Sequence, residues 1–403
     1  MSRKILFTGG EVVTPTVVLP GGWVLVEDGL IAAVGVPGAG AVGVDAATGA
    51  PSGHLADGAE VIDLHGRRLL PGFIDLHVHG AAGGSFDAGA DGIDIGLQAH
   101  RRHGTTRSIV SLVTAPIDVM AERIHSAAAH VGDDPHVLGL HLEGPFLSEL
   151  RRGVHDPAAL IAPSRALIDR LLDAGGGAVR IVTVAPELDG GLAAVEQVVA
   201  AGSIAAVGHS DAGYDCASAA FGLGASLVTH AFNGMRPLHH RDPAVIGAAM
   251  DAQGVVLEAI NDGVHLHPAT VRLLRAMAPG RVALVTDAMA AAGHGDGHYE
   301  LAGFDVQVSG GVARIVTDDG SEGSIAGSTL TLDVAVRRAV EHVGTDLVDA
   351  VNAASLVPAR VLGVDDRFGS IVSGKVADLL VADRHGAVEA VLVAGDWSDE
   401  RRP

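Results

Sequence analysis

The chain has 403 residues, of which 48% are hydrophobic, so it can supply a barrel of about 250 residues and a smaller domain. Its formal net charge of −21 disfavours nucleic-acid backbones and anionic membranes as partners, because like charges repel. The single cysteine, Cys216, excludes an intrachain disulfide. The sequence has neither a signal-peptide-like apolar segment at its start nor a run of about 20 apolar residues, and a cytoplasmic location is therefore expected.

Residues 3–70 are predicted to form short β-strands, because β-rich runs alternate there with Gly and Pro. Residues 38–59, rich in Gly, Ala and Asp, are predicted to be a surface loop. Eight short apolar runs then recur, and between them lie Ala-rich stretches of helical periodicity such as 191–201, 214–223 and 268–277. This alternation favours an α/β fold of the (β/α)8 TIM-barrel type, with an open sheet as the alternative.

The pattern changes after residue 298. Residues 299–316 are predicted to form a β-hairpin with a Gly-Gly turn, and residues 324–343 and 347–362 are predicted to be helices. The tail returns to short strands. Because chain ends of a domain often lie close together, we expect a small β-sandwich domain built from residues 1–65 and 355–403, and a barrel built from residues 66–354.

Seven of the eight apolar runs end in His, Asp or Glu. The residues are His77, His79, Glu143, Glu187, His209, His230, His265 and Asp287. In a closed barrel the C-terminal ends of the strands converge on one face, so these side chains are expected to meet in one site. The pattern predicts metal-dependent hydrolysis.

His77 and His79 are two residues apart, so both side chains can point toward one ion. His209 and His230 end neighbouring strands of the predicted sheet, which stand about 4.8 Å apart. Together with Glu143, which would bind one ion or bridge two, they are ligands that suit zinc or iron. Asp287 ends the last strand and suits the role of general base and then general acid, although it can also be a ligand.

Four further polar residues, His155, Asn233, Arg241 and His265, follow strands in the predicted loops and are candidates for substrate binding. Arginine binds phosphate through two parallel hydrogen bonds, so Arg241 makes an anionic substrate plausible despite the negative net charge. Glu187 is expected to orient a neighbouring side chain rather than to bind the metal itself.

The ordered motifs resemble one family. PGFIDLHVHG, HLEGPF, RRGVHDP, VTVAPE, GHSDAGYD, THAFNGMRPLHHRDPAVIGAA, DGVHLHP, VTDAMAAAG and IAGS occur in the order found in N-acetylglucosamine-6-phosphate deacetylases of the amidohydrolase superfamily. The resemblance covers residues of about 65–330. It implies hydrolysis of a 2-acetamido group to give glucosamine 6-phosphate and acetate, in amino-sugar catabolism and cell-wall recycling.

The resemblance also implies roles for individual residues. Glu143, His209 and His230 match the metal ligands of the family, and His77 and His79 match the extra pair of members with two metals, so one or two divalent cations are implied. Asp287 matches the catalytic acid/base, and His155 matches a loop histidine near the acetyl group. The implied substrate-binding residues are His155, Asn233, Gly234, Arg241, Asp262, His265, Ile325, Ala326 and Gly327. Arg241 resembles a phosphate contact made across a dimer interface, which implies a homodimer.

Two rival hypotheses remain from the sequence. One is a related amidohydrolase that acts on N-acetylgalactosamine 6-phosphate or an N-acyl amino acid, and a requirement for phosphate would separate these substrates. The other is a non-catalytic scaffold, since a fold does not fix a function. Lys4 and Lys375 are the only lysines and lie outside the barrel region, which argues against cyclic-amide hydrolases that use a bridging lysine.

Overall fold

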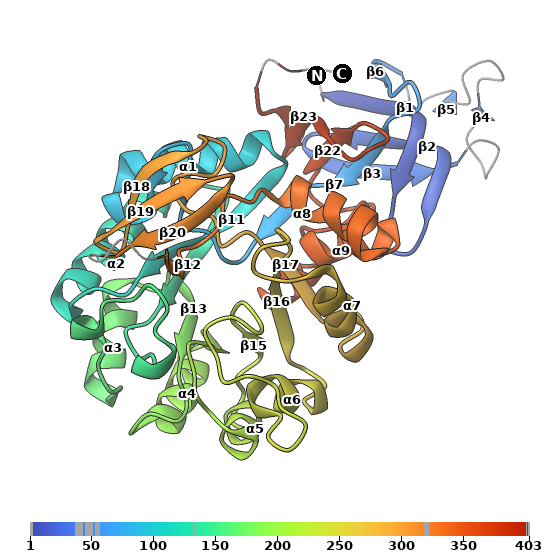
Figure 1. Ribbon diagram of the computed structural model, residues 1–403. Helices are drawn as coiled ribbons and strands as arrows, with labels where there is room; N and C mark the ends of the chain where they lie inside the picture. Colours follow the sequence, from blue (N-terminus) through green and yellow to red (C-terminus); the bar gives the residue numbers. More distant parts are fainter. Residues whose placement is uncertain are drawn as a thin grey trace. The chain divides into compact units, whose positions relative to one another are not determined.

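The structure is a computed structural model that describes residues 3–36, 43–44, 51–52, 57–132, 134–317, 322–399 and 401 (Figure 1). The chain divides into two compact units. The first contains residues 1–74, 100–107 and 332–403, and the second contains residues 75–99 and 108–331. The domain boundaries expected from the sequence, 1–65 with 355–403 and 66–354, stay a prediction.

A nearly closed barrel, built mostly from residues of the second unit, confirms the predicted fold class. Its eight-stranded sheet has the order β17-β16-β15-β14-β13-β12-β11-β8. The strands are β8 (Phe73–Asp75), β11 (Thr105–Val113), β12 (Val137–Glu143), β13 (Val179–Val184), β14 (Ile204–Val207), β15 (Leu227–Val228), β16 (Val256–Ile260) and β17 (Val282–Val285). A parallel bridge between Val78 and Ala288, just after the first and last strands, brings the two ends of the sheet together.

The barrel strands are mostly apolar and are buried on both faces, although β11 also buries polar residues. All nine residues of β11 are buried, as expected for a parallel strand covered on both sides. The helices are α1 (Ala90–Arg102), α2 (Ile117–Val131), α3 (Arg165–Ala174), α4 (Gly191–Ala200), α5 (Tyr214–Gly222), α6 (Ala244–Asp251) and α7 (Pro268–Met277). Helices α2 to α7 lie outside the strands in Figure 1, and the helices predicted at 191–201, 214–223 and 268–277 are confirmed.

A four-stranded antiparallel sheet follows the last barrel strand. It consists of β18 (Gly297–Leu301), β19 (Phe304–Ser309), β20 (Val312–Val316) and β21 (Glu322–Ile325). Gly310 and Gly311, at φ +57° and +77°, form the turn between β19 and β20, so the predicted Gly-Gly hairpin is confirmed. The buried side chains of this sheet pack on Val113 and Met289 of the barrel unit.

The helix predicted at 324–343 is wrong in its first part. Residues up to Ile325 belong to β21, and Ser328 forms a parallel bridge with Ala288. Gly327, at φ +63°, cannot continue a right-handed helix, so α8 (Leu332–Arg338) begins only at Leu332, and the π-helix η4 (Ala339–Val343) follows it. The helix predicted at 347–362 is divided at Ser355 into α9 (Leu347–Ala354) and α10 (Leu356–Val361).

The first unit contains a mostly antiparallel sheet built from both ends of the chain, as predicted. Its order is β24-β23-β22-β7-β1-β2-β3, with β6 beside β1. These strands are β1 (Lys4–Val13), β2 (Val18–Glu27), β3 (Leu30–Gly35), β6 (Glu60–Asp63), β7 (Arg68–Pro71), β22 (Leu379–Ala382), β23 (Val388–Val393) and β24 (Asp396–Trp397). Residues such as Phe7, Val24, Leu69 and Leu392 form one buried cluster on this sheet.

Several short elements complete the described chain. They are β4 (Gly43–Val44), β5 (Pro51–Ser52), β9 (Gly80–Ala81), β10 (Gly84–Ser85) and the 3-10 helices η1 (Phe86–Ala88), η2 (Glu149–Arg151) and η3 (Pro157–Ala159). The surface loop predicted at 38–59 lies mostly outside the described residues. Across the described ranges, no helix has the length and apolar character needed to cross a membrane.

Candidate metal centre and active site

The polar side chains of the candidate site stand at the ends of barrel strands. Glu143 is the last residue of β12, whereas His77, His209, His230 and Asp287 each lie two residues beyond the end of β8, β14, β15 and β17, respectively. All of these side chains are largely buried, with the Asp287 residue the most exposed at 8%. The expected convergence on the C-terminal face of the barrel is therefore present.

Three of these residues have strained backbones. His209, His230 and Asp287 have φ values of +45°, +28° and +49°. A left-handed conformation costs a residue other than glycine about 1–3 kcal/mol and persists where surrounding contacts hold it, commonly at functional sites. The conformation turns the chain sharply at the strand ends and holds these side chains in the cavity.

Glu143, His209 and His230 form a first group. Glu143 Oε1 lies 3.1 Å from Nε2 of His209 and 3.1 Å from Nε2 of His230. The two Nε2 atoms are 3.0 Å apart. These three atoms therefore face one common point.

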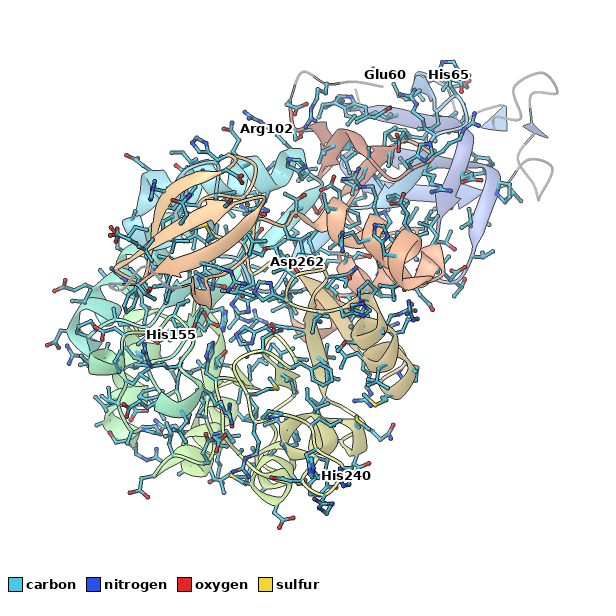
Figure 2. The ribbon with its side chains drawn as sticks, viewed as in Figure 1. Glu60, His65, Arg102, His155, His240 and Asp262 are labelled. Atoms are coloured by element: carbon cyan, nitrogen blue, oxygen red, sulfur yellow. The ribbon has the colours of Figure 1, made fainter. Side chains whose placement is uncertain are left out.

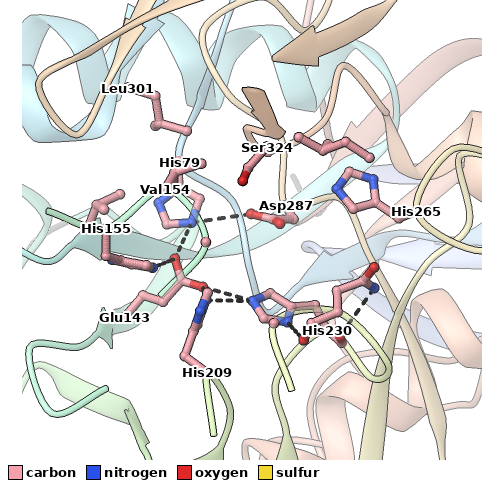
Figure 3. Close-up of a pocket in the computed structure, with 16 residues that line it drawn as sticks. His79, Glu143, Val154, His155, His209, His230, His265, Asp287, Leu301 and Ser324 are labelled. Carbon is pink, nitrogen blue, oxygen red and sulfur yellow. Dashed lines mark hydrogen bonds and ion pairs between the residues drawn. The ribbon is translucent and has the colours of Figure 1, made fainter. Parts of the chain in front are cut away.

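His77, His79 and Asp287 form a second group. The Nε2 atoms of His77 and His79 are 3.0 Å apart, and Asp287 Oδ1 lies 3.5 Å and 3.4 Å from them. Glu143 connects the groups, because its Oε1 is 3.5 Å from His77 Nε2 and its Oε2 is 3.2 Å from His79 Nε2. Figure 3 shows Glu143 between His79 on one side and His209 and His230 on the other.

The donor set fits a divalent cation. Two ligand atoms on one tetrahedral cation, with bonds of about 2.0–2.1 Å, are about 3.3 Å apart, close to the separations in both groups. His77, His79 and Asp287 present such atoms together, as do Glu143, His155 and His209. Among the described residues that line the cavity there is neither lysine nor arginine to balance Glu143 and Asp287. A bound cation would supply that positive charge.

Hydrogen bonds fix the orientation of the imidazoles. Nδ1 of His209 donates to the backbone oxygen of Arg151 at 2.8 Å, and Nδ1 of His230 donates to the backbone oxygen of Asn233 at 3.2 Å. Because a carbonyl oxygen can only accept, the proton is on Nδ1 and the Nε2 lone pair faces the centre of the group. That is the tautomer that binds a metal.

Electrostatic interactions keep both carboxylates ionised. Burial by itself would raise the pKa of Glu143, but positive charge beside it, on protonated His77, His209 and His230 or on a cation that replaces their Nε2 protons, holds that pKa well below its usual range. Burial likewise opposes ionisation of Asp287, and the nearby His77 and His79 outweigh it, so the pKa of Asp287 is also lowered. Asp287 is therefore ionised at neutral pH, the state that a general base requires.

His155 is a neutral, unsatisfied histidine. Burial and the neighbouring His209 lower the pKa of His155 to about 3. Within the described ranges neither of its buried ring nitrogens has a hydrogen-bond partner, and its Nε2 lies 3.7 Å from Glu143 Oε2. Because a neutral imidazole carries one N–H group, His155 has a donor available for a ligand.

A cavity of about 300 Å³ opens over these groups and contains most of the predicted substrate-binding residues. His155, Asn233, Gly234, His265, Ile325 and Gly327 line it. Val113, Val154 and Leu301 form an apolar part of its wall. In Figure 3, Val154 and Leu301 lie beside His79, whereas His265 lies on the other side of Asp287.

Three predicted residues are placed outside the lining. Asp262 accepts a hydrogen bond of 2.7 Å from Nδ1 of His265, so it orients a cavity residue. Ala326 is fully buried beside the lining residues Ile325 and Gly327. Arg241 is exposed and lines a separate surface pocket with Tyr214 and Cys216. The adjacent His240 lies at the edge of the second unit, away from His155 and Asp262 (Figure 2).

Two buried polar residues of the site were missed by sequence reasoning. Glu258, on β16, accepts a hydrogen bond from Nδ1 of His77 at 3.0 Å. His141, on β12, hydrogen-bonds Ser111 and Thr183 and packs its ring against that of His77. A polar residue inside an apolar strand run was the available signal in both cases. Glu187, predicted to orient a neighbour, accepts a hydrogen bond of 2.7 Å from Ser210, the residue after His209.

Comparisons with known proteins identify similar sequences over most of the chain. The model of the amidohydrolase family matches residues 68–398. The N-acetylgalactosamine-6-phosphate deacetylase of Escherichia coli O157:H7 is 38% identical, over 81% of this chain and 86% of that protein. The N-acetylglucosamine-6-phosphate deacetylase of Bacillus subtilis is 33% identical, over 98% of this chain and 97% of that protein.

Solved structures agree with this similarity. N-acetyl-D-glucosamine-6-phosphate deacetylase from Mycobacterium smegmatis is 40% identical, with a TM-score of 0.88 over 98% of this chain and 99% of that chain. A variant of that enzyme, solved in complex with N-acetyl-D-glucosamine-6-phosphate, has a TM-score of 0.89. The similarity therefore includes both units of the fold.

Proposed function

We propose that this chain, which belongs to the amidohydrolase family, hydrolyses the acetamido group of N-acetyl-D-glucosamine 6-phosphate to give D-glucosamine 6-phosphate and acetate. The observation that carries the proposal is the cavity in which Glu143, His209 and His230 face one point and Asp287 stands at the second group. The same reaction is named for relatives that match almost the whole chain.

Glu143, His209 and His230 would hold one divalent cation, Zn²⁺ or Fe²⁺, and His77 and His79 would hold a second. Such a cation supplies Lewis acidity, which polarises an amide carbonyl and makes water a stronger acid. The side chains of the protein supply the remaining chemistry. We expect the enzyme to act in the cytoplasm as a homodimer.

Asp287 performs the proton transfers in this proposal. Its carboxylate, ionised because its pKa is low, accepts a proton from the attacking water. It then donates that proton to the nitrogen of the sugar as the C–N bond breaks. His155, neutral because its pKa is about 3, donates its N–H group to the oxygen on which negative charge develops. His265, which is hydrogen-bonded to Asp262, would contact a sugar hydroxyl in this proposal.

N-acetyl-D-galactosamine 6-phosphate is a second candidate substrate, because an N-acetylgalactosamine-6-phosphate deacetylase is among the relatives, at 38% identity. The two sugars differ only in the configuration of one hydroxyl group. The experiment is an acetate-release assay on both phosphorylated sugars and on both unphosphorylated sugars, with the metal-loaded protein. We expect the highest kcat/KM on N-acetyl-D-glucosamine 6-phosphate. A higher kcat/KM on N-acetyl-D-galactosamine 6-phosphate would make that sugar the proposed substrate. Equal kcat/KM values on the phosphorylated and unphosphorylated sugars would contradict both substrate assignments.

Arg241 is proposed to bind the phosphate in the site of a partner subunit, since it lies away from the cavity of its own chain. Replacing Arg241 with Ala should raise KM for the phosphorylated sugar by about 10- to 100-fold, the loss expected for a charged hydrogen bond. The kcat should change little, because Arg241 does not touch the reacting bond. The control is Arg170→Ala, which removes another exposed arginine. An unchanged KM, or a protein that is monomeric by light scattering, would contradict the proposal.

A further inference from the structure

Glu258 is a buried carboxylate that hydrogen-bonds a histidine of the candidate metal centre. It occupies the middle of β16 (VLEAI), and only 1% of the residue is exposed. Burial of an ionised carboxylate is unfavourable unless hydrogen bonds compensate for the lost water. The partners of Glu258 therefore indicate why an acidic residue stands in an otherwise apolar strand.

One oxygen of Glu258 contacts both groups of candidate ligands. Oε2 accepts a hydrogen bond from Nδ1 of His77 at 3.0 Å and another from the backbone N–H of His230 at 3.1 Å. His77 belongs to the group with His79 and Asp287, whereas His230 belongs to the group with Glu143 and His209. A single side chain thus fixes one member of each group.

The contact with His77 decides which of its nitrogens is available. An ionised carboxylate can only accept a hydrogen bond, so the imidazole proton is held on Nδ1. Nε2 is then left with a lone pair, and it lies 3.0 Å from Nε2 of His79 and 3.5 Å from Asp287 Oδ1. A carboxylate behind a ligand histidine also increases the electron density of the coordinating nitrogen.

The contact with His230 holds a strained turn. The backbone of His230 has φ +28°, outside the usual range for a residue with a side chain. A hydrogen bond from its N–H to a buried carboxylate offsets part of the cost of that conformation. Glu258 therefore restrains the turn that presents the His230 ring to Glu143.

We propose that Glu258 is a positioning residue that determines how tightly a divalent cation is held by His77 and His79, and that it acts through His77. The inference rests on the proposed function only in that a cation occupies the cluster. Glu258 does not touch the cavity and takes no part in proton transfer with the substrate.

The test is a Zn²⁺ titration of the metal-free protein against a competing chelator, for the wild type and Glu258→Gln. Gln has the same shape, but its amide can donate to Nδ1 and so move the imidazole proton to Nε2. We expect the affinity for one Zn²⁺ to fall by about 10- to 100-fold, the range found for partners of ligand histidines. A Glu258→Gln protein that binds Zn²⁺ as the wild type does would overturn the proposal.

A double-mutant cycle shows whether Glu258 acts through His77. Once His77→Gln has removed the ligand, adding Glu258→Gln should cause no further loss of affinity for the Zn²⁺ at His79, whereas an effect through His230 would appear at the group of Glu143, His209 and His230. Full additivity of the two losses would overturn the proposal. Glu187→Gln is the matched control, because Glu187 hydrogen-bonds Ser210 rather than His77, and its effect should add to that of His77→Gln.

Two further measurements distinguish a misfolded variant, a wrong proposed function and a wrong role for Glu258. Thermal unfolding of each metal-free variant reports whether it folds. If Glu258→Gln does not fold, Glu258→Asp replaces it, because the shorter side chain keeps the negative charge but moves the acceptor oxygen away from Nδ1 of His77. A wild-type protein that binds neither Zn²⁺ nor Fe²⁺ would contradict the proposed function itself. A wild type that binds Zn²⁺ and deacetylates normally, alongside a Glu258→Gln variant of equal affinity, would contradict only the role of Glu258.

Discussion

Replacing Asp287 with Asn should lower kcat by at least about 10²- to 10⁴-fold, the contribution of a general acid–base residue, while the metal content per chain stays the same. Asn retains the size of Asp and one oxygen that can face His77 and His79, which lie 3.5 Å and 3.4 Å from Asp287 Oδ1. It cannot accept and return a proton at neutral pH. The loss should therefore appear in kcat, with little change in KM.

The measurement is steady-state deacetylation together with elemental analysis of the same sample. The control is Asp305→Asn, which removes an exposed carboxylate on β19 and should leave both values unchanged. Turnover within a few fold of the wild type would show that Asp287 does not transfer the proton. Loss of metal together with turnover would instead make Asp287 primarily a ligand.

Replacing Glu143 with Gln should remove most of the bound metal and nearly all activity. Both oxygens of Glu143 are used, because Oε1 faces His77, His209 and His230, and Oε2 faces His79. An amide has no charge to balance a cation and points an N–H₂ group, which cannot bind a metal, toward one of the two groups. The fall in metal affinity should exceed about 100-fold, the upper limit for residues that only orient a ligand.

Metal content after dialysis against a weak chelator and kcat/KM measured with excess Zn²⁺ test this prediction. Glu149→Gln is the matched control, since Glu149 is an exposed glutamate in η2, a short distance further along the chain. A Glu143→Gln protein that keeps its full metal content would contradict the ligand role proposed for Glu143. Activity restored by excess Zn²⁺ alone would indicate that Glu143 increases affinity without contributing to the chemistry.

The barrel could be predicted because its signals are local. Each strand is a short apolar run, and a polar residue at or just past its end marks the point where the chain reaches the cavity. His209, His230 and Asp287 follow this rule at a spacing of two residues from their strands. A closed parallel sheet then brings such residues together whatever their separation in sequence. The fold class and the convergence of these side chains could therefore be predicted from the sequence alone.

Other features depend on contacts that sequence patterns do not contain. Glu258 and His141 lie inside strands, and their roles depend on the neighbour across the barrel, His77. The start of α8 at Leu332 depends on a bridge between Ser328 and Ala288, which overrides the helical periodicity of residues 324–331. Tertiary pairing took precedence over local preference in each case.

We propose above all that Glu143, His209 and His230 hold a divalent cation at the C-terminal end of the barrel. The most direct measurement is a crystal structure of the Zn²⁺-loaded protein with an anomalous difference map recorded at the zinc absorption edge. We predict a peak within about 2.0–2.2 Å of Glu143 Oε1 and of Nε2 of both histidines. A map with its zinc peaks elsewhere in the molecule, and none among these three atoms, would contradict it.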